Sequence, residues 1–121
     1  MSGWACRRDF GRRGRAESGN AFPVKPIEYH EAAEQELLSE IGYLEQRAPG
    51  IGRRFFMEVR RAENFIAKFP EAAEEILPSV RKRPLRKFQY SLIYTIQPST
   101  LLILAVAHHR RRPNYWVGRT T

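Results

Sequence analysis

Residues 101–107, with the sequence LLILAVA, contain no polar side chain, and this run most constrains how the chain can fold. Seven apolar residues are too few for a membrane-spanning helix, which needs roughly 18 or more. A strand that is buried on one face alternates apolar and polar residues, whereas a strand covered on both faces does not. The run therefore predicts a central strand, packed on both faces by other parts of the chain.

The chain length allows one compact domain with a single core. It has 121 residues, of which 42% are hydrophobic. Residues 1–22 hold five Arg and four Gly without clear periodicity, so we expect a disordered basic extension over 1–22 and a folded domain over 23–121. The single cysteine, Cys6, cannot form an internal disulfide and fits a reducing cytosol. With no apolar run long enough for a membrane span, we predict a cytoplasmic protein without a membrane partner.

Two amphipathic helices are predicted before the apolar run. In residues 31–47, apolar side chains recur at spacings of four and three residues: Ala33, Leu37, Ile41 and Leu44. Residues 51–69 repeat this spacing with larger side chains: Phe55, Val59, Ala62, Ile66 and Phe69. Pro49-Gly50 separates the two segments and Pro70 ends the second. So short a break predicts an antiparallel helical hairpin that packs on a sheet.

Strand patterns surround the hairpin. We predict a short strand over 24–29, at an edge of the sheet because Pro26 cannot donate to a ladder. After Pro70 we predict a Glu-rich connection and then strands over 80–87, 90–96 and 101–107. Pro84 predicts a kink, and residues 97–100 predict a turn. The order β-α-α-β-β-β indicates an α+β fold, with a small, mostly antiparallel, twisted sheet and the hairpin on one face.

Charge is distributed unevenly along the chain. Residues 78–121 hold nine Lys or Arg and no Asp or Glu, whereas residues 24–77 hold seven basic and eleven acidic residues. Clustered cations that neutralise a polyanion gain affinity through counterion release. We therefore predict a cationic, phosphate-binding face on the side of the sheet opposite the hairpin. A dock for an acidic protein is the alternative interpretation.

An ordered set of segments resembles the RelE/ParE toxin superfamily. The set comprises a strand ending in Tyr29, two helices separated by Pro49, Phe69-Pro70, the strand FQYSLIY over 88–94, and the ending HHRRRPNYW over 108–116. The resemblance implies a RelE/ParE-like fold and a type II toxin with a cognate antitoxin. We expect the antitoxin to bind the cationic face through an acidic, partly disordered segment.

The superfamily divides by target. The resemblance to RelE-like members implies ribosome-dependent mRNA cleavage by 2′-hydroxyl attack, and the resemblance to ParE-like members implies inhibition of DNA gyrase without a nuclease centre. Our leading prediction is the endoribonuclease, with the ribosome and mRNA as partners. The alternatives are the gyrase inhibitor and a non-toxic nucleic-acid-binding domain or decayed toxin.

Cleavage by the 2′-hydroxyl route needs an acid, a base and cations that hold the scissile phosphate. An imidazole titrates near neutral pH, so one of His108 and His109 is a candidate acid or base; strand alternation directs only one of them into the site. Arg86 and Arg110 stand about where the resemblance implies phosphate-binding arginines. Tyr115 would stack on a base or supply a phenol.

Further cations and one aromatic side chain complete the predicted nucleic-acid surface: Arg81, Lys82, Arg83, Lys87, Arg111, Arg112, Trp116 and Arg119. Ser91 is a departure, because the resemblance implies an Arg there, as RelE-like and many ParE-like members have. No metal or cofactor is expected, because carboxylates are absent after Glu75. Two alternatives remain: the histidines are structural residues, and Arg110 to Arg112 form an electrostatic steering patch or the antitoxin dock.

Overall fold

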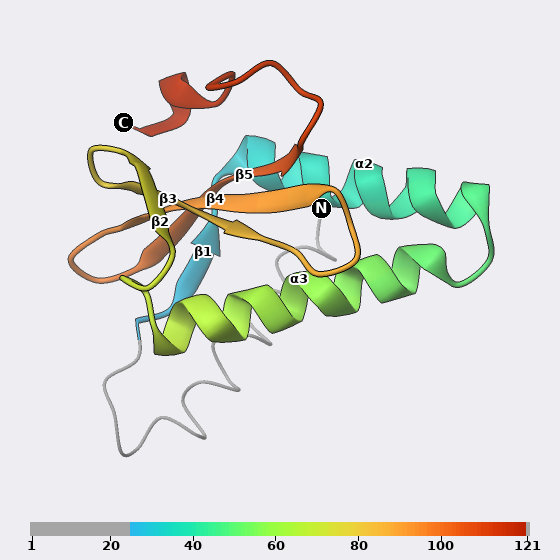
Figure 1. Ribbon diagram of the computed structural model, residues 1–121, viewed down its shortest axis with the longest axis horizontal. Coiled ribbons are helices and arrows are strands. Elements are labelled where there is room, and N and C mark those ends of the chain that lie inside the picture. The colour runs from blue at the N-terminus through green and yellow to red at the C-terminus, as the bar shows by residue number, and fades with distance from the viewer. Residues whose placement is uncertain (1–24, 121) are drawn as a thin grey trace.

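The computed structural model describes residues 25–120, which form two helices and five strands (Figure 1). The elements, in chain order, are β1 (Ile27–Tyr29), α2 (Glu31–Arg47), α3 (Ile51–Lys68), β2 (Glu74–Leu77), β3 (Val80–Pro84), β4 (Tyr90–Ile96), β5 (Leu101–His108) and a 3₁₀ turn (Val117–Thr120). The strands are arranged β1-β5-β4-β3-β2, and only the β1–β5 pair is parallel. The predicted α+β class and mostly antiparallel sheet are confirmed. The extension predicted over 1–22 lies outside the described residues.

Local chemistry closes the hairpin between α2 and α3. The carboxylate of Glu45 accepts hydrogen bonds from the backbone N–H groups of Gly50 (2.9 Å) and Gly52 (3.0 Å), which caps the start of α3. Gly50 has a φ of 87°, a conformation that favours glycine. A Cβ atom at Gly52 would lie 2.6 Å from the carbonyl oxygen of Ile41, so glycine lets the two helices approach closely. The break predicted at Pro49-Gly50 is confirmed.

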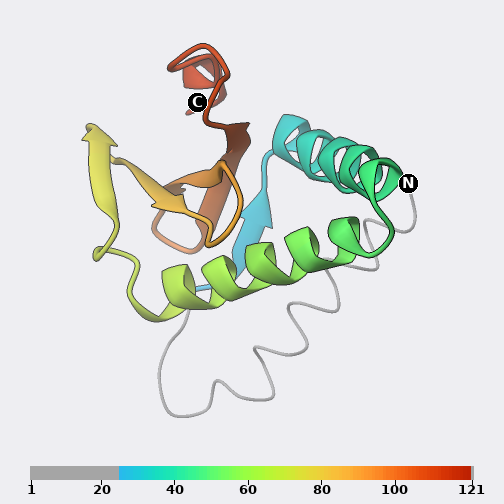
Figure 2. The same cartoon turned by 45° about the vertical axis from the view of Figure 1, so that its right-hand side comes forward.

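Both helices bury one stripe against the sheet, in what we call the helix-side core. Ala33 and Leu37 of α2 are buried, and so are the side chains on the predicted stripe of α3: Phe55, Val59, Ala62 and Ile66. Phe69 is a correction, because it follows the end of α3 and remains 55% exposed. Figures 1 and 2 show the hairpin extending past the sheet at the α2–α3 connection.

Strand β5 is buried on both faces, as its apolar run predicts. Leu101, Ile103 and Val106 face the helix-side core, whereas Leu104 and Ala105 face a second core that contains Trp116, the tail-side core. Two consecutive residues share this second face because Ile93 pairs with Ala105 and Tyr94 with Ile103, which leaves Leu104 as a bulge. The bulge reverses the alternation of side chains over the end of β5.

Two predictions on the other half of the sheet are wrong. Residues 74–77, predicted as a connection, form an additional strand, β2. Their glutamates lie on an exposed edge strand, which a tight turn joins to β3, with Ser79 at a φ of 66°. Strand β3 ends at Pro84 instead of residue 87, because proline lacks the N–H that a further ladder bond needs. Residues 85–89 therefore form a loop.

We predict that Phe55→Ala destabilises the fold by about 3–5 kcal/mol, since the ring is fully buried and its removal leaves a cavity. Urea unfolding monitored by circular dichroism measures this change. Met57→Ala, two residues along α3 and 54% exposed, is the control and should change stability by less than about 0.5 kcal/mol. Equal effects of the two substitutions would contradict the assignment of α3 faces.

Candidate functional site

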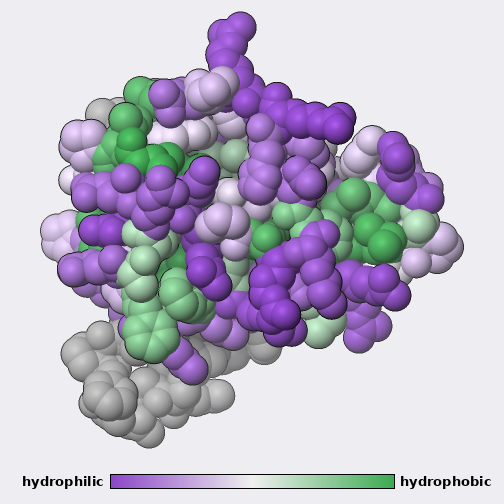
Figure 3. All heavy atoms as spheres, in the orientation of Figure 1, coloured by the Kyte–Doolittle hydropathy of each residue, from purple (hydrophilic) through white to green (hydrophobic). Residues whose placement is uncertain are grey.

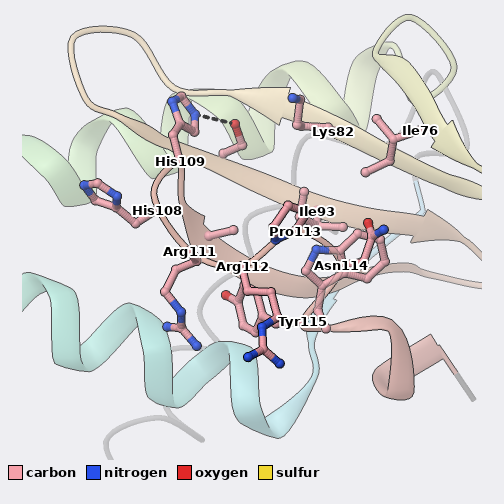
Figure 4. A pocket seen from close by; sticks show the side chains of 13 residues that line it. Ile76, Lys82, Ile93, His108, His109, Arg111, Arg112, Pro113, Asn114 and Tyr115 are labelled. Atoms are coloured by element: carbon pink, nitrogen blue, oxygen red, sulfur yellow. Dashed lines mark hydrogen bonds between the residues drawn. The ribbon is translucent and has the colours of Figure 1, made fainter.

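A cavity of about 340 Å³ opens on the sheet face opposite the helices (Figure 4). Its floor comes from neighbouring strands: Lys82 of β3, Ser91 and Ile93 of β4, and Ala107 of β5. Its wall is the last residue of β5 and the segment that follows it: His108, His109, Arg111, Arg112, Pro113, Asn114, Tyr115 and Trp116. The predicted basic C-terminal segment therefore folds back over the face where we expected function.

Ser91 and His109 form a hydrogen-bonded pair at one end of the cavity. The Oγ atom of Ser91 lies 2.9 Å from Nε2 of His109, and the Ser91 side chain is buried while His109 is exposed. The backbone N–H of His109 donates to the carbonyl oxygen of Gln89 (2.8 Å), which extends the β4–β5 pairing and orients the imidazole. Ser91, the position where the resemblance implies an Arg, is thus hydrogen-bonded to His109.

The two histidines point in different directions (Figure 4). The imidazole of His108 packs edge-to-face on Tyr90 at 4.8 Å, and Tyr90 belongs to the helix-side core. Its Nδ1 accepts a hydrogen bond from the backbone N–H of Arg110 (2.9 Å). The bulge at Leu104 causes this orientation, because it places residues 106 and 108 on the helix face. His109 is therefore the histidine that is paired with Ser91 beside the cavity.

A clamp fixes the C-terminal segment against the edge of β5. Strand β1 pairs only with residues 101–103, so the backbone of Leu104 and Val106 needs other partners. Glu36 of α2 accepts from the Val106 N–H (3.0 Å) and pairs with Arg119 (3.0 Å). Arg119 also donates to the carbonyl oxygen of Leu104 (3.0 Å). Sequence reasoning missed Glu36, because its place on an acidic helix carries no signal of this contact.

Tyr115 is held between cations and the clamp. The guanidinium carbon of Arg111 lies 4.1 Å from the centre of its ring, and that of Arg119 lies 5.2 Å away. Burial, and after it the Glu36 carboxylate, raises the pKa of the Tyr115 phenol above its usual value. The phenol is therefore protonated at neutral pH and can donate a hydrogen bond but cannot act as a base. Trp116 is buried in the tail-side core, so its ring packs there and does not present a free stacking face.

The remaining predicted cations do not join the cavity. Arg81 donates to the carbonyl oxygens of Glu71 (3.0 Å) and Ala73 (2.7 Å), and Arg83 lies 3.8 Å over the ring of Phe65 on α3. Both therefore lie on the helix side of β3, whereas Lys82 faces the cavity. This differs from our expectation that the basic residues of this strand share the face opposite the hairpin.

Three further predicted site residues are exposed on loops. Arg86 and Lys87 lie on the β3–β4 loop, away from the cavity, and Arg110 lies in the turn after β5 with its side chain outside the cavity lining. Among residues 25–120, no three His, Cys, Asp or Glu side chains cluster as they would around a metal ion. In the same range, no helix is long and apolar enough to cross a bilayer.

Comparison with known proteins identifies the fold and the family. The family model described as the ParE toxin of type II toxin-antitoxin system, parDE, matches residues 27–113, which is more than half of the chain. A solved structure described as the chromosomal ParDE TA system from P. aeruginosa matches with a TM-score of 0.57 at 11% identity, covering 72% of this chain and 98% of that chain. No curated protein sequence matches this chain.

We predict that Tyr115→Phe reduces the loss of stability at high pH. A phenol whose pKa is raised in the folded state stays protonated there while the same phenol in the unfolded chain ionises. The contribution of Tyr115 to the free energy of unfolding is therefore constant below about pH 10, and stability falls as the pH rises further. One such group changes the free energy of unfolding by at most about 1.4 kcal/mol per pH unit. Urea unfolding between pH 8 and 11 measures the difference between variant and parent, and identical pH profiles would contradict this environment for Tyr115.

Proposed function

Because this chain belongs to the ParE family of toxins of type II toxin–antitoxin systems, we propose that it inhibits DNA gyrase by binding and performs no catalysis. A type II toxin is paired with a cognate antitoxin, which is its first partner. The family assignment favours gyrase as the target over the ribosome. Mechanistically, the toxin acts as a binding module, and its cationic C-terminal segment supplies the contact surface.

The dispersal of the predicted catalytic side chains is the observation that carries this proposal. Arg86, expected to hold the scissile phosphate, lies on the β3–β4 loop outside the cavity. His108 packs edge-to-face on Tyr90, away from the pair that His109 forms with Ser91. A nuclease requires its acid, base and cations around one phosphate. These positions favour a toxin that binds its target.

The exposed part of the C-terminal segment is the surface that we assign to gyrase. Arg110 and Arg112 are exposed on one short turn, while the segment behind them is fixed by Trp116 and the Glu36–Arg119 pair. Exposed charges on a rigid support accelerate association with an oppositely charged partner. We infer that an acidic antitoxin segment covers the same turn and so blocks access to gyrase.

We predict that the purified protein inhibits gyrase supercoiling of relaxed plasmid, and that Arg110→Ala with Arg112→Ala weakens inhibition about tenfold, since rim charges act mainly on the association rate. His109→Ala is the discriminating variant and should keep near-parental inhibition, because the imidazole would perform no chemistry. Intact supercoiling at saturating protein would sink the proposal.

Ribosome-dependent mRNA cleavage is the second candidate, and the contents of the cavity favour it. His109, Lys82, Arg111 and Arg112 all line one cavity on the predicted face, beside the protonated phenol of Tyr115. An imidazole among cations is suited to move a proton while phosphate charge is stabilised. In this mechanism, His109 is the acid or base and Lys82 contacts the phosphate.

Primer extension on a translated message from induced cells tests the second candidate. Discrete cuts that His109→Ala reduces about 100-fold or more, and that persist in EDTA with isolated ribosomes, would replace gyrase by the ribosome as the target. Absence of cuts together with arrested supercoiling supports the gyrase proposal. Normal growth with neither effect would identify a non-toxic binding domain or a decayed toxin.

A further inference from the structure

We propose that the outer face of α3 and the adjoining β3–β4 loop bind the phosphate backbone of duplex DNA, at a surface distinct from the cavity. This surface, the α3 ridge, lies on the helix layer and contains six exposed cations: Arg53, Arg54, Arg61, Lys68, Arg86 and Lys87. The proposed gyrase contact lies on the C-terminal segment and not on this surface, so the proposal does not depend on gyrase.

Helix α3 presents four of its five cations on a single exposed face. Positions 53, 54, 57, 61, 64 and 68 recur at helical spacing, and all six residues are exposed. They are four cations, one asparagine and Met57, with no carboxylate among them. The opposite face of α3 is the buried stripe described above, so the ridge points away from the core. Figure 3 shows hydrophilic side chains gathered over this helix in the lower centre of the view.

The β3–β4 loop adds two cations beside the same helix. Phe88 packs edge-to-face on Phe55 of α3, with ring centres 5.4 Å apart, and this contact anchors the loop. Figures 1 and 2 both show the loop lying next to α3. Lys87 has a φ of 68°, and both Arg86 and Lys87 are exposed. The loop that is absent from the cavity is therefore part of a second cationic surface.

Nearby carboxylates neutralise little of this charge. Glu58 approaches Arg61 at 3.8 Å, yet Arg61 remains 59% exposed, and such surface pairs contribute little in water. The acidic side chains of the hairpin lie mainly on α2, which has five Glu and one Arg, whereas α3 has five basic and two acidic residues. Averaging over residues 24–77 hides this division, so the sequence alone indicated an acidic region.

The chemistry of the ridge favours a nucleic-acid backbone over an acidic protein. Four of its six cations are arginines, whose forked donors match phosphate oxygens. Met57 is the one exposed apolar side chain among the ridge positions, whereas protein interfaces need a buried apolar or aromatic centre. The 18 residues of α3 form a straight rod of roughly 27 Å, which suits a regular line of charge.

Duplex DNA suits the ridge better than duplex RNA. The major groove of B-form DNA is wide enough to admit an α-helix, with phosphates along both walls. The major groove of A-form RNA is deep and narrow, so side chains on a helix do not enter it. The binding that we propose is independent of base sequence, because it is carried by charge.

Fluorescence anisotropy of the full chain with a labelled duplex of about 20 base pairs, over a series of salt concentrations, tests the proposal. The ridge variant combines Arg54→Ala, Arg61→Ala and Lys68→Ala, and alanine preserves helix propensity at these exposed sites. The matched control combines Lys82→Ala, Arg111→Ala and Arg112→Ala, which removes the same charge from the cavity. We expect the ridge variant to bind at least tenfold more weakly, with its salt slope reduced by about 0.9 for each phosphate that it no longer neutralises, and the control to change much less.

Three results would overturn the proposal. Equal weakening in the two variants would show that net charge alone drives binding, and an unchanged ridge variant would exclude the ridge. Equal or tighter binding of duplex RNA would exclude the preference for B-form DNA. Glutamine replacements at the same three positions provide a second ridge variant if thermal unfolding shows that the alanine variant is not folded. The assay contains no gyrase, so failure of the DNA-binding proposal is distinguishable from failure of the proposed function.

Discussion

Strand β5 makes the contacts on which the rest of the structure depends. It pairs with β1 and β4, and its side chains enter both cores, as those of β4 also do. The bulge at Leu104 lets a strand of eight residues serve both faces, because it reverses which residues meet the helices. Without that reversal, residues 105 and 107 would face α2 and α3, and the ring of His108 would lose its contact with Tyr90. The chemistry available on the far side of the sheet is thus decided by one unpaired residue.

The same strand explains why the C-terminal segment is part of the domain. The shortness of β1 leaves the edge of β5 without strand partners past residue 103, and buried backbone groups require hydrogen bonds. Glu36 and Arg119, which are 83 positions apart in sequence, make those hydrogen bonds. Trp116 then closes the tail-side core, and the arginines between it and β5 are left on a supported turn. The contacts that close the edge of β5 therefore also hold these arginines in place.

Charge is segregated on this fold in a way that its linear distribution only partly shows. The C-terminal excess of cations is divided between the cavity wall, the helix side of β3 and the β3–β4 loop. Helix α3 contributes a further cationic face, while the carboxylates of α2 are directed partly toward Arg119 and Tyr90. Two cationic surfaces on separate layers result.

The sequence by itself determined the elements and the layers. Periodicity placed both helices within one residue of their ends, and the run over 101–107 identified a strand that is buried twice, because burial patterns are local and repeat along the chain. The ordered segments also indicated the superfamily. Strand β2 escaped prediction because an exposed edge strand of glutamates has no apolar alternation. Only the tertiary structure decided which histidine meets Ser91, where Arg86 lies, and that Glu36 holds the tail. Those outcomes depend on a bulge, a loop and an edge contact, and each arises from pairing between distant residues that no local pattern records.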